Sequence, residues 1–290
     1  EDFRWSFTIK APGISSFSLG KSGYNNPDYG LQDISPEEFF ILSFQQPMDQ
    51  ASLEANLTLT SQNGENVPLL YDWQVEDTSL IFTPTVRLAL GTTYYLSVNP
   101  AAQSANGGGL REGLDWSFTT IPYPAILWTQ PSDGVTDWMD SSFSIKFASP
   151  IRLDSLKDKV IFNPAPESDP QWNYNDWDWS IYYYGILQPS TSYEVRILPG
   201  IEDLYGNQIT TEMVVRFITG PLTPNASLVM PYTPALYRVG GSQQFYVGYQ
   251  NITSLDLRLY RLSPDKMNST YDYTPPGTDL VWSSERSISG

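Results

Sequence analysis

One short pattern occurs three times in this chain. It occupies residues 5–9 (WSFTI), 116–121 (WSFTTI) and 215–219 (VRFIT). Each copy alternates large apolar with small polar residues, which is typical of a half-buried β-strand. Pro122 and Pro221 follow the second and third copies, and proline interrupts a strand because it has no N–H to donate. We therefore expect each copy to be the last strand of a repeated module.

Other matches place the two halves of the chain in register. An offset of 103 residues aligns the first part of each half, for example Phe44 with Phe147. The remainder aligns without a gap at an offset of 99 residues. The pairs at that offset include Trp73 with Trp172, Leu80 with Trp179, Leu88 with Leu187, Tyr94 with Tyr193, and Phe118 with Phe217.

The repeated segments are short, alternate in polarity and are separated by Gly, Pro, Asn and Asp turns, with almost no helical periodicity. This pattern predicts an all-β chain of tandem immunoglobulin-like β-sandwiches. We assign residues 10–121 to the first sandwich and 122–220 to the second. Residues 1–9 are predicted to be the exit strand of a preceding repeat, and 221–290 the start of a third β-sandwich. The chain would then be an excerpt of a longer protein, with its neighbouring domains as partners.

The most specific local pattern is the run before Tyr94 (LALGTTY) and the one before Tyr193 (LQPSTSY). Both fit a tyrosine corner, in which the phenol bonds to backbone a few residues upstream. We therefore assign both tyrosines to structure rather than to a binding site. We assign four further aromatic residues to the cores: Trp73, Phe118, Trp172 and Phe217.

Composition excludes several function classes. The chain has no cysteine and no histidine, which excludes Ser-His-Asp and Cys-His catalysis, disulfides and histidine-ligated zinc within it. Its 16 basic and 32 acidic residues give a net charge of −16, which disfavours nucleic acid and anionic membranes as partners. The chain has no run of about 18 apolar residues, the length that a membrane-spanning helix needs. We expect no cofactor and no enzymatic activity.

The second half carries a family resemblance. Its order of motifs runs from Pro-x-Asp-Gly-Val to a final Phe-x-Thr, and resembles the bacterial Ig-like domains of S-layer proteins. Residues 10–121 depart from it, because an Asn106-Gly107-Gly108-Gly109 turn replaces Asp-x-x-Gly-Asn. The resemblance implies a spacer or presenting module of a bacterial surface, secreted or periplasmic protein. The residues that carry it are Pro131, Asp133, Gly134, Val135, Phe147, Pro150, Ser155, Leu156, Leu187, Pro189, Thr191, Tyr193, Asp203, Gly206, Asn207 and Phe217.

After Pro221 the pattern changes. Leu255, Leu257 and Leu259 alternate with polar neighbours, which predicts a half-buried strand. This segment is similar to the opening of a macroglobulin-type β-sandwich of the bacterial alpha-2-macroglobulins. That resemblance implies a protease-trapping protein with proteases as partners. Its thioester needs a cysteine, so the trapping chemistry would lie outside this chain.

Residues 171–184 form the most aromatic stretch of the chain. If Trp172, Trp179 and Ile181 face the core, the remaining rings are surplus and could stack on sugars or contact a neighbouring domain. An open, coplanar row would favour a carbohydrate-binding or adhesion module, the alternative to a spacer. Burial against the adjacent domain would favour the spacer. The surplus rings are Tyr174, Trp177, Tyr182 and Tyr184.

Acidic and amide side chains in the same stretch raise the question of calcium. Asp176 and Asp178, with Asn173 and Asn175, offer oxygen ligands but lack the Gly and the terminal Glu of an EF-hand loop. Asp and Asn are also common turn formers, so we favour turns here. We interpret residues 203–207 (DLYGN) in the same way, as a hairpin turn rather than a metal loop.

One pair of adjacent carboxylates, Glu37 and Glu38, raises the question of a glycosidase. Such an enzyme needs two carboxyl groups about 5 to 10 Å apart across a substrate cleft. The sequence alone does not place any pair of its carboxylates across such a cleft, and it indicates no large insertion that could build one. We therefore favour a spacer without catalytic activity.

Overall fold

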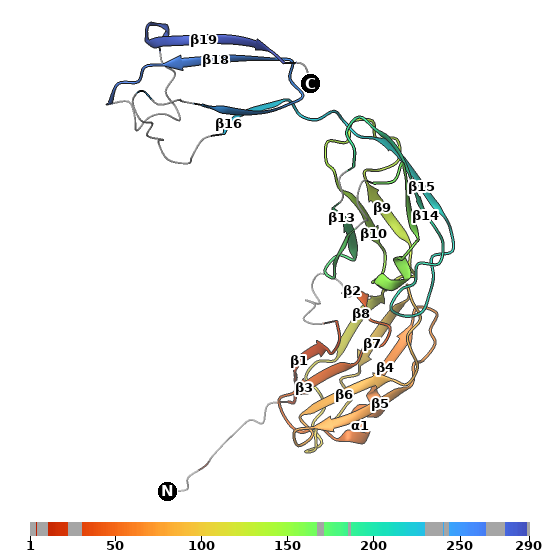
Figure 1. Cartoon of the computed structure of the whole chain (residues 1–290). Helices are drawn as coiled ribbons and strands as arrows, with labels where there is room; N and C mark the ends of the chain where they lie inside the picture. Colours follow the sequence, from red (N-terminus) through yellow and green to blue (C-terminus); the bar gives the residue numbers. More distant parts are fainter. Residues whose placement is uncertain are drawn as a thin grey trace.

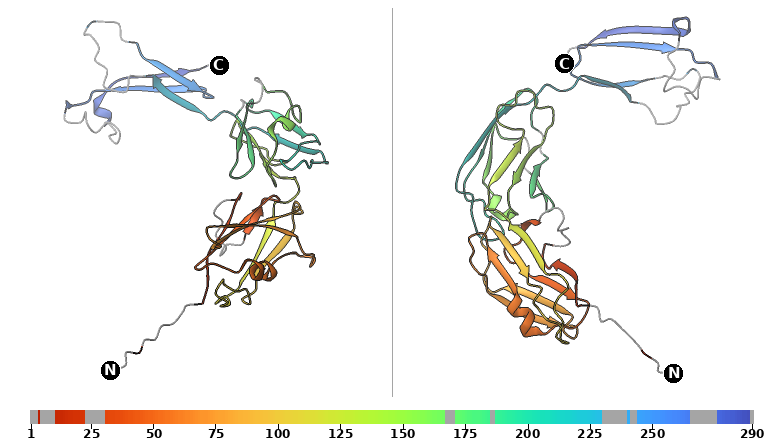
Figure 2. Two further views of the ribbon diagram at one scale, coloured as in Figure 1. Left: turned by 90° about the horizontal axis from the view of Figure 1, so that it is seen from below. Right: turned by 180° about the vertical axis from the view of Figure 1, so that it is seen from behind.

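The computed structural model describes Arg4 and residues 11–22, 31–166, 171–184, 187–229, 240, 244–264 and 276–288. Its regular secondary structure is almost entirely strand, as predicted, and the single α-helix among the described residues is α1 (Gln50–Asn56). Two sandwiches lie end to end, and a pair of hairpins follows them (Figures 1 and 2). The strand predicted at residues 5–9 and the Pro27–Gly30 turn signal lie outside the described residues.

The first sandwich packs two four-stranded sheets face to face. All neighbouring strands are antiparallel except β2 and β8, which run parallel. The first sheet has the order β1-β3-β6-β5, with bounds Ile14–Leu19, Phe40–Phe44, Ser79–Pro84 and Leu69–Gln74. The second has the order β2-β8-β7-β4, with bounds Leu31–Ile34, Leu114–Thr120, Thr93–Val98 and Leu57–Ser61.

Aromatic rings from both sheets meet in the first core. Alternate residues of β3 are buried, because successive side chains of a strand point to opposite faces. The Phe40 ring lies 5.2 Å from Phe82 on its own sheet and 5.3 Å from Phe118 on the other. Burying each such ring contributes about 1.5–3 kcal/mol, so this cluster holds the two sheets together.

The second sandwich repeats this plan with one four-stranded and one three-stranded sheet. Its core joins Phe143 to Phe217 at 6.0 Å and to Phe162 at 5.4 Å, again across the two sheets. The first sheet has the order β12-β13-β10-β9, with bounds Trp172–Asn175, Ser180–Tyr183, Phe143–Phe147 and Ile126–Gln130. The second has the order β11-β14-β15, with bounds Val160–Asn163, Ser192–Ile197 and Met213–Ile218.

Strand pairing corrects part of the predicted alignment between the sandwiches. Leu42 pairs with Leu80 in the first, and Ile145 pairs with Ile181 in the second. Because Leu42 and Ile145 match at the offset of 103 residues, Leu80 matches Ile181. The predicted match of Leu80 with Trp179 is therefore wrong, and Trp179 lies in the turn before β13.

The same correction applies one strand further out. Trp73 pairs with Leu80, and Tyr174 pairs with Ile181. Trp73 therefore matches Tyr174, and its predicted match with Trp172 is wrong. The offset is 101 residues here and returns to 99 at Leu187, because the step from Ile181 to Leu187 is two residues shorter than the step from Leu80 to Leu88. Hydrogen-bonded pairing sets the register, and the loop absorbs the difference.

Both tryptophans that we assigned to the cores pack against them, although they are not equivalent. Trp73 is partly buried against the first core, and its indole N–H donates to Glu54 Oε1 at 2.9 Å. Trp172 is partly buried against the second core, with its ring 5.7 Å from that of Tyr183.

The third part of the chain forms two separate hairpins. β16 (Asn225–Val229) pairs with β17 (Tyr246–Gln250), and β18 (Ser254–Tyr260) pairs with β19 (Leu280–Ser287). No residue of these four strands is buried. The alternation predicted in β18 is only partial, because Leu255 and Leu257 are half-buried whereas Leu259 is exposed.

Candidate functional site

A tyrosine hydroxyl ties the loop before β7 to the end of the first sandwich. The phenol oxygen of Tyr94 accepts a hydrogen bond from the Ala89 backbone N–H at 2.8 Å. Thr120, at the end of β8, donates its hydroxyl to the Ala89 carbonyl at 2.6 Å. Phe118 is 2% exposed beneath them. The second sandwich repeats all four roles with Tyr193, Gln188, Thr219 and Phe217.

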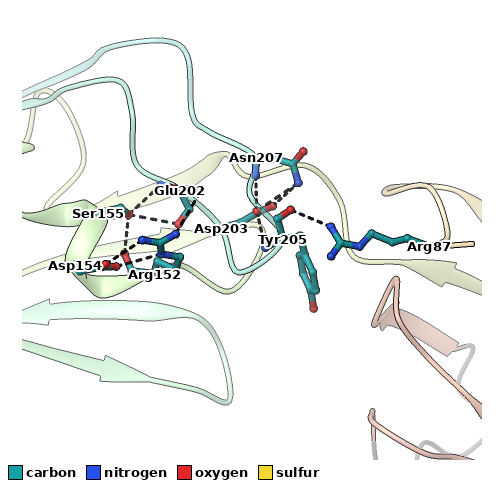
Figure 3. A network of polar contacts seen from close by, with 8 residues as sticks. All are labelled: Arg87, Arg152, Asp154, Ser155, Glu202, Asp203, Tyr205 and Asn207. Carbon is teal, nitrogen blue, oxygen red and sulfur yellow. Dashed lines mark hydrogen bonds and ion pairs between the residues drawn. The ribbon is translucent and has the colours of Figure 1, made fainter.

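This end of the first sandwich faces the second, and Arg87 joins them (Figure 3). Arg87 lies in the loop between β6 and β7. Its Nη1 donates to the backbone carbonyl of Tyr205, in the second sandwich, at 3.1 Å. Its Nη2 lies 2.5 Å from Glu37 Oε1, in the first sandwich. One guanidinium group therefore contacts both modules.

The two adjacent carboxylates support Arg87 from the first sandwich. Glu37 also pairs with Lys21 Nζ at 3.0 Å, and hydrogen bonds from Lys21 and Arg87 hold the pKa of Glu37 below its ordinary value. Glu38 is fully buried and accepts backbone N–H groups of Ser22 at 2.9 Å and Phe39 at 3.2 Å. One carboxylate is thus held in ion pairs and the other organises backbone, which leaves neither free as a general acid.

The second sandwich presents Tyr205 on a tight turn. The Asp203 carboxylate is 0% exposed and accepts the backbone N–H groups of Tyr205 at 2.9 Å and Asn207 at 2.8 Å. It also accepts the Asn207 amide at 3.0 Å, while Gly206 takes the positive φ of 89° that the turn requires. Residues 203–207 therefore form a closed turn in which the carboxylate serves the backbone. Burial raises the pKa of the Tyr205 phenol, and the Ser35 side chain of the first sandwich works against that rise.

A second arginine braces the segment that leads into this turn (Figure 3). Arg152 pairs with Asp154 at 3.0 Å and with Glu202 at 3.4 Å. The Ser155 hydroxyl accepts the Glu202 backbone N–H at 2.9 Å. Hydrogen bonding between Arg152 and Asp154 raises the pKa of the arginine and lowers that of the carboxyl. These contacts hold the residues immediately before the turn in place.

A cleft of about 720 Å³ opens beside the joint, with walls from both sandwiches. Its lining is polar and aromatic rather than purely apolar. Its lining includes Gln32, Asp33 and Ser35 of the first sandwich, and Lys146, Trp177 and Trp179 of the second.

The four aromatic residues singled out in the sequence do not form one row. Trp177 is 97% exposed and lines the cleft. Tyr182 and Tyr184 lie together, with ring centroids 6.2 Å apart and an interplanar angle of 16°. Tyr174 packs against the second core, and burial raises the pKa of its phenol. Tyr174 is therefore not a surplus ring.

The acidic and amide residues around Trp177 act as turn formers. Asn175 Oδ1 accepts the Trp177 backbone N–H at 3.0 Å. The Asp178 carboxylate accepts the backbone N–H and the hydroxyl of Ser180, at 3.1 and 3.0 Å. Within the described part of the chain, no group of three or more His, Cys, Asp or Glu side chains could hold a metal ion.

Sequence reasoning missed the residues that form the joint. Arg87 and Ser35 lie in loops and belong to no recognisable motif, and Tyr205 is the variable residue inside the 203–207 turn. The signal that could have found Tyr205 is the contrast between the two turns. The corresponding turn of the first sandwich has only small residues, Asn106-Gly107-Gly108, where the second has the large Tyr205.

Comparisons with known proteins agree with this architecture. A family model described as a bacterial Ig-like domain matches residues 24–120 and again residues 122–219. Among the described residues, no helix is long and apolar enough to cross a membrane. A search of curated proteins finds no match to the sequence.

Solved structures show distant similarity. The N-terminal part of the bacterial S-layer protein SbsC is 13% identical with a TM-score of 0.29, over 72% of this chain and 44% of that one. E. coli alpha-2-macroglobulin in its native conformation is 9% identical with a TM-score of 0.29, over 97% of this chain and 11% of that one. A segment of the same E. coli protein is 8% identical with a TM-score of 0.30, over 85% of this chain and 77% of that one. The chain spans less than half the length of the first two.

Proposed function

This chain belongs to the family of bacterial Ig-like domains, and on that premise we propose that its two sandwiches form a non-catalytic, semi-rigid spacer. The spacer would hold the third part of the chain at a distance from the far end of the first sandwich. We place the protein at the bacterial cell surface or outside the cell, in keeping with the family. The observation that carries the proposal is the joint at Arg87, which contacts both modules.

The connection between the sandwiches supports limited motion. The chain crosses from β8 to β9 through residues 121–125. Ile121 donates its backbone N–H to the Ile34 carbonyl at 3.0 Å, and Ala125 accepts the Ala148 backbone N–H at 2.9 Å. The link is thus hydrogen-bonded to the first sandwich at one end and to the second at the other, which leaves little free length for a hinge.

The joint is nevertheless weak enough to yield. Solvent-exposed ion pairs contribute about 0.2–1 kcal/mol each, and the Arg87 and Glu37 side chains are 52% and 40% exposed. Domains joined by small polar contacts move relative to one another by default. We therefore describe the spacer as semi-rigid, with one preferred angle and restricted excursions around it.

We further propose that the third part of the chain opens a macroglobulin-like sandwich of a protease-trapping protein. The half-buried Leu255 and Leu257 of β18 support this assignment. Proteases would then be partners of the whole protein and not of these sandwiches. Incubating the full-length protein with a protease tests this part of the proposal, because trapping would protect the protease from a large inhibitor but not from a small one.

Small-angle X-ray scattering of the chain tests the spacer itself. We expect an elongated particle whose pair-distance distribution has the long, asymmetric tail of end-to-end modules (Figure 2). The distribution should not change on dilution, because the extended shape belongs to a single chain. A compact, symmetric distribution would contradict the spacer, since it would mean that the modules fold back on one another.

A further inference from the structure

The cleft between the two sandwiches has features that a spacer does not need. It measures about 720 Å³, which falls in the range of small-molecule sites. One wall belongs to the first sandwich, through Gln32, Asp33 and Ser35. The other belongs to the second, through residues 176–179 and Lys146. A ligand held there would contact both modules.

Trp177 is the most exposed large apolar residue among those described, at 97%. The fold does not require a ring at this place. The carbonyls of Thr78 and Trp179 accept equivalent strand N–H groups, at 2.8 and 3.2 Å, in the first and second sandwich. These two residues therefore match, and the position of Trp177 corresponds to Glu76. The two turns differ in backbone, because Glu76 has a positive φ of 50° whereas Trp177 does not. At this position one module carries a charged side chain and the other an exposed indole.

The turn fixes the backbone that carries the indole. The Trp177 backbone N–H is bonded to Asn175 Oδ1, and the Asp178 carboxylate fixes Ser180 on the other side. The next ring, Trp179, has a positive φ of 54° and carries Lys146 Nζ at 5.8 Å from its centroid. Left-handed backbone at a bulky residue is costly and tends to occur where function requires it.

The opposite wall supplies polar groups. Asp33 also has a positive φ, of 57°, a conformation that aspartate adopts more readily than most residues. Removal from water raises the pKa of its carboxyl, and the positive charge of Lys146 across the cleft opposes that rise. The Gln32 amide and the Ser35 hydroxyl lie within the same lining. Aromatic faces on one side and amide, hydroxyl and carboxylate groups on the other suit a ligand with an apolar face and many hydroxyl groups.

We propose that this cleft binds a neutral oligosaccharide. The rings of Trp177 and Trp179 stack on the apolar faces of pyranose units, and Gln32, Asp33 and Ser35 hydrogen-bond to their hydroxyl groups. A neutral glycan is favoured over an anionic one because the chain carries a net charge of −16, which repels polyanions. This activity is separate from the spacer role, which rests on Arg87.

Isothermal titration of the whole chain with chitotetraose, cellotetraose and maltotetraose tests the proposal, with oligogalacturonate as the anionic comparison. The variant Trp177→Glu should fold, because the Trp177 side chain is 97% exposed and its replacement removes no buried contact. The matched control is Tyr184→Ser, which removes an exposed ring from the Tyr182–Tyr184 pair outside the cleft. Gln32→Ala, on the first sandwich, is a second variant of the cleft. Circular dichroism confirms that each variant is folded.

We expect saturable binding of at least one neutral probe, about tenfold weaker in Trp177→Glu, weaker in Gln32→Ala and unchanged in Tyr184→Ser. No binding of any neutral probe would overturn the proposal, as would preference for oligogalacturonate. Loss of binding in Tyr184→Ser with normal binding in Trp177→Glu would also overturn it, because the ligand would then lie on the Tyr182–Tyr184 pair.

Discussion

At the scale of single residues, the same hydroxyl contact closes the corresponding end of each sandwich. In the first, the Tyr94 phenol accepts the Ala89 N–H while Thr120 donates to the Ala89 carbonyl. Side chains therefore bond both the N–H and the carbonyl of Ala89, in a loop that lacks a strand partner. Sequence alone suggested the tyrosine but not the threonine, because Thr120 reads simply as the end of an alternating strand.

Tyr94→Phe should destabilise the first sandwich by about 0.5–1.5 kcal/mol, the usual net contribution of one hydrogen bond. The ring still fills the core against Phe118, so no cavity adds to this cost. Tyr95→Phe is the matched control, because the neighbouring side chain is 50% exposed and its hydroxyl can bond to water. Urea unfolding of both variants compares the two costs. Equal midpoints would contradict a structural role for the Tyr94 hydroxyl.

At the scale of elements, the turn at residues 203–207 depends on one buried carboxylate. Asp203→Ala removes the acceptor of the Tyr205 and Asn207 backbone N–H groups. Hydrogen bonds to a charged group contribute about 1.5–3 kcal/mol, so we expect the second sandwich to lose about 3 kcal/mol of stability. The contact between Arg87 and Tyr205 should weaken with it.

The control for this change is Asp154→Ala, which removes an exposed carboxylate that pairs with Arg152. We expect little change in its unfolding midpoint, since water replaces that contact. Thermal unfolding followed by tryptophan fluorescence compares the variants. If Asp203→Ala unfolds at the same temperature as the wild-type chain, the carboxylate does not organise the turn.

The elements also show where sequence reasoning fails. Strand periodicity predicted the all-β fold and the closing strands, because alternation follows directly from strand geometry. The register near Trp73 and Trp172 could not be predicted in the same way. Both Trp172 and Tyr174 place an aromatic ring against the core, and only the backbone pairing of Tyr174 with Ile181 shows which of them matches Trp73.

At the scale of the whole molecule, the joint is the feature that sequence could not supply. Arg87, Glu37 and Tyr205 are far apart in the chain and lie in loops, and no periodicity links them. They come together only when both sandwiches have folded and the hydrogen-bonded link at residues 121–125 has set the distance between them. The site therefore depends on tertiary structure, whereas the modules themselves follow from local patterns.

If Arg87 restricts the angle between the sandwiches, a label in each module should report one preferred distance. The chain contains no cysteine, so Thr58→Cys in β4 and Asn163→Cys in β11, both exposed, allow one spin label in each module. Pulsed electron–electron double resonance then measures the distance distribution between the labels. We predict one narrow distribution for the otherwise wild-type chain and a clearly broader one when Arg87→Ala is added. A distribution that is already broad, and that Arg87→Ala leaves unchanged, would contradict the semi-rigid spacer.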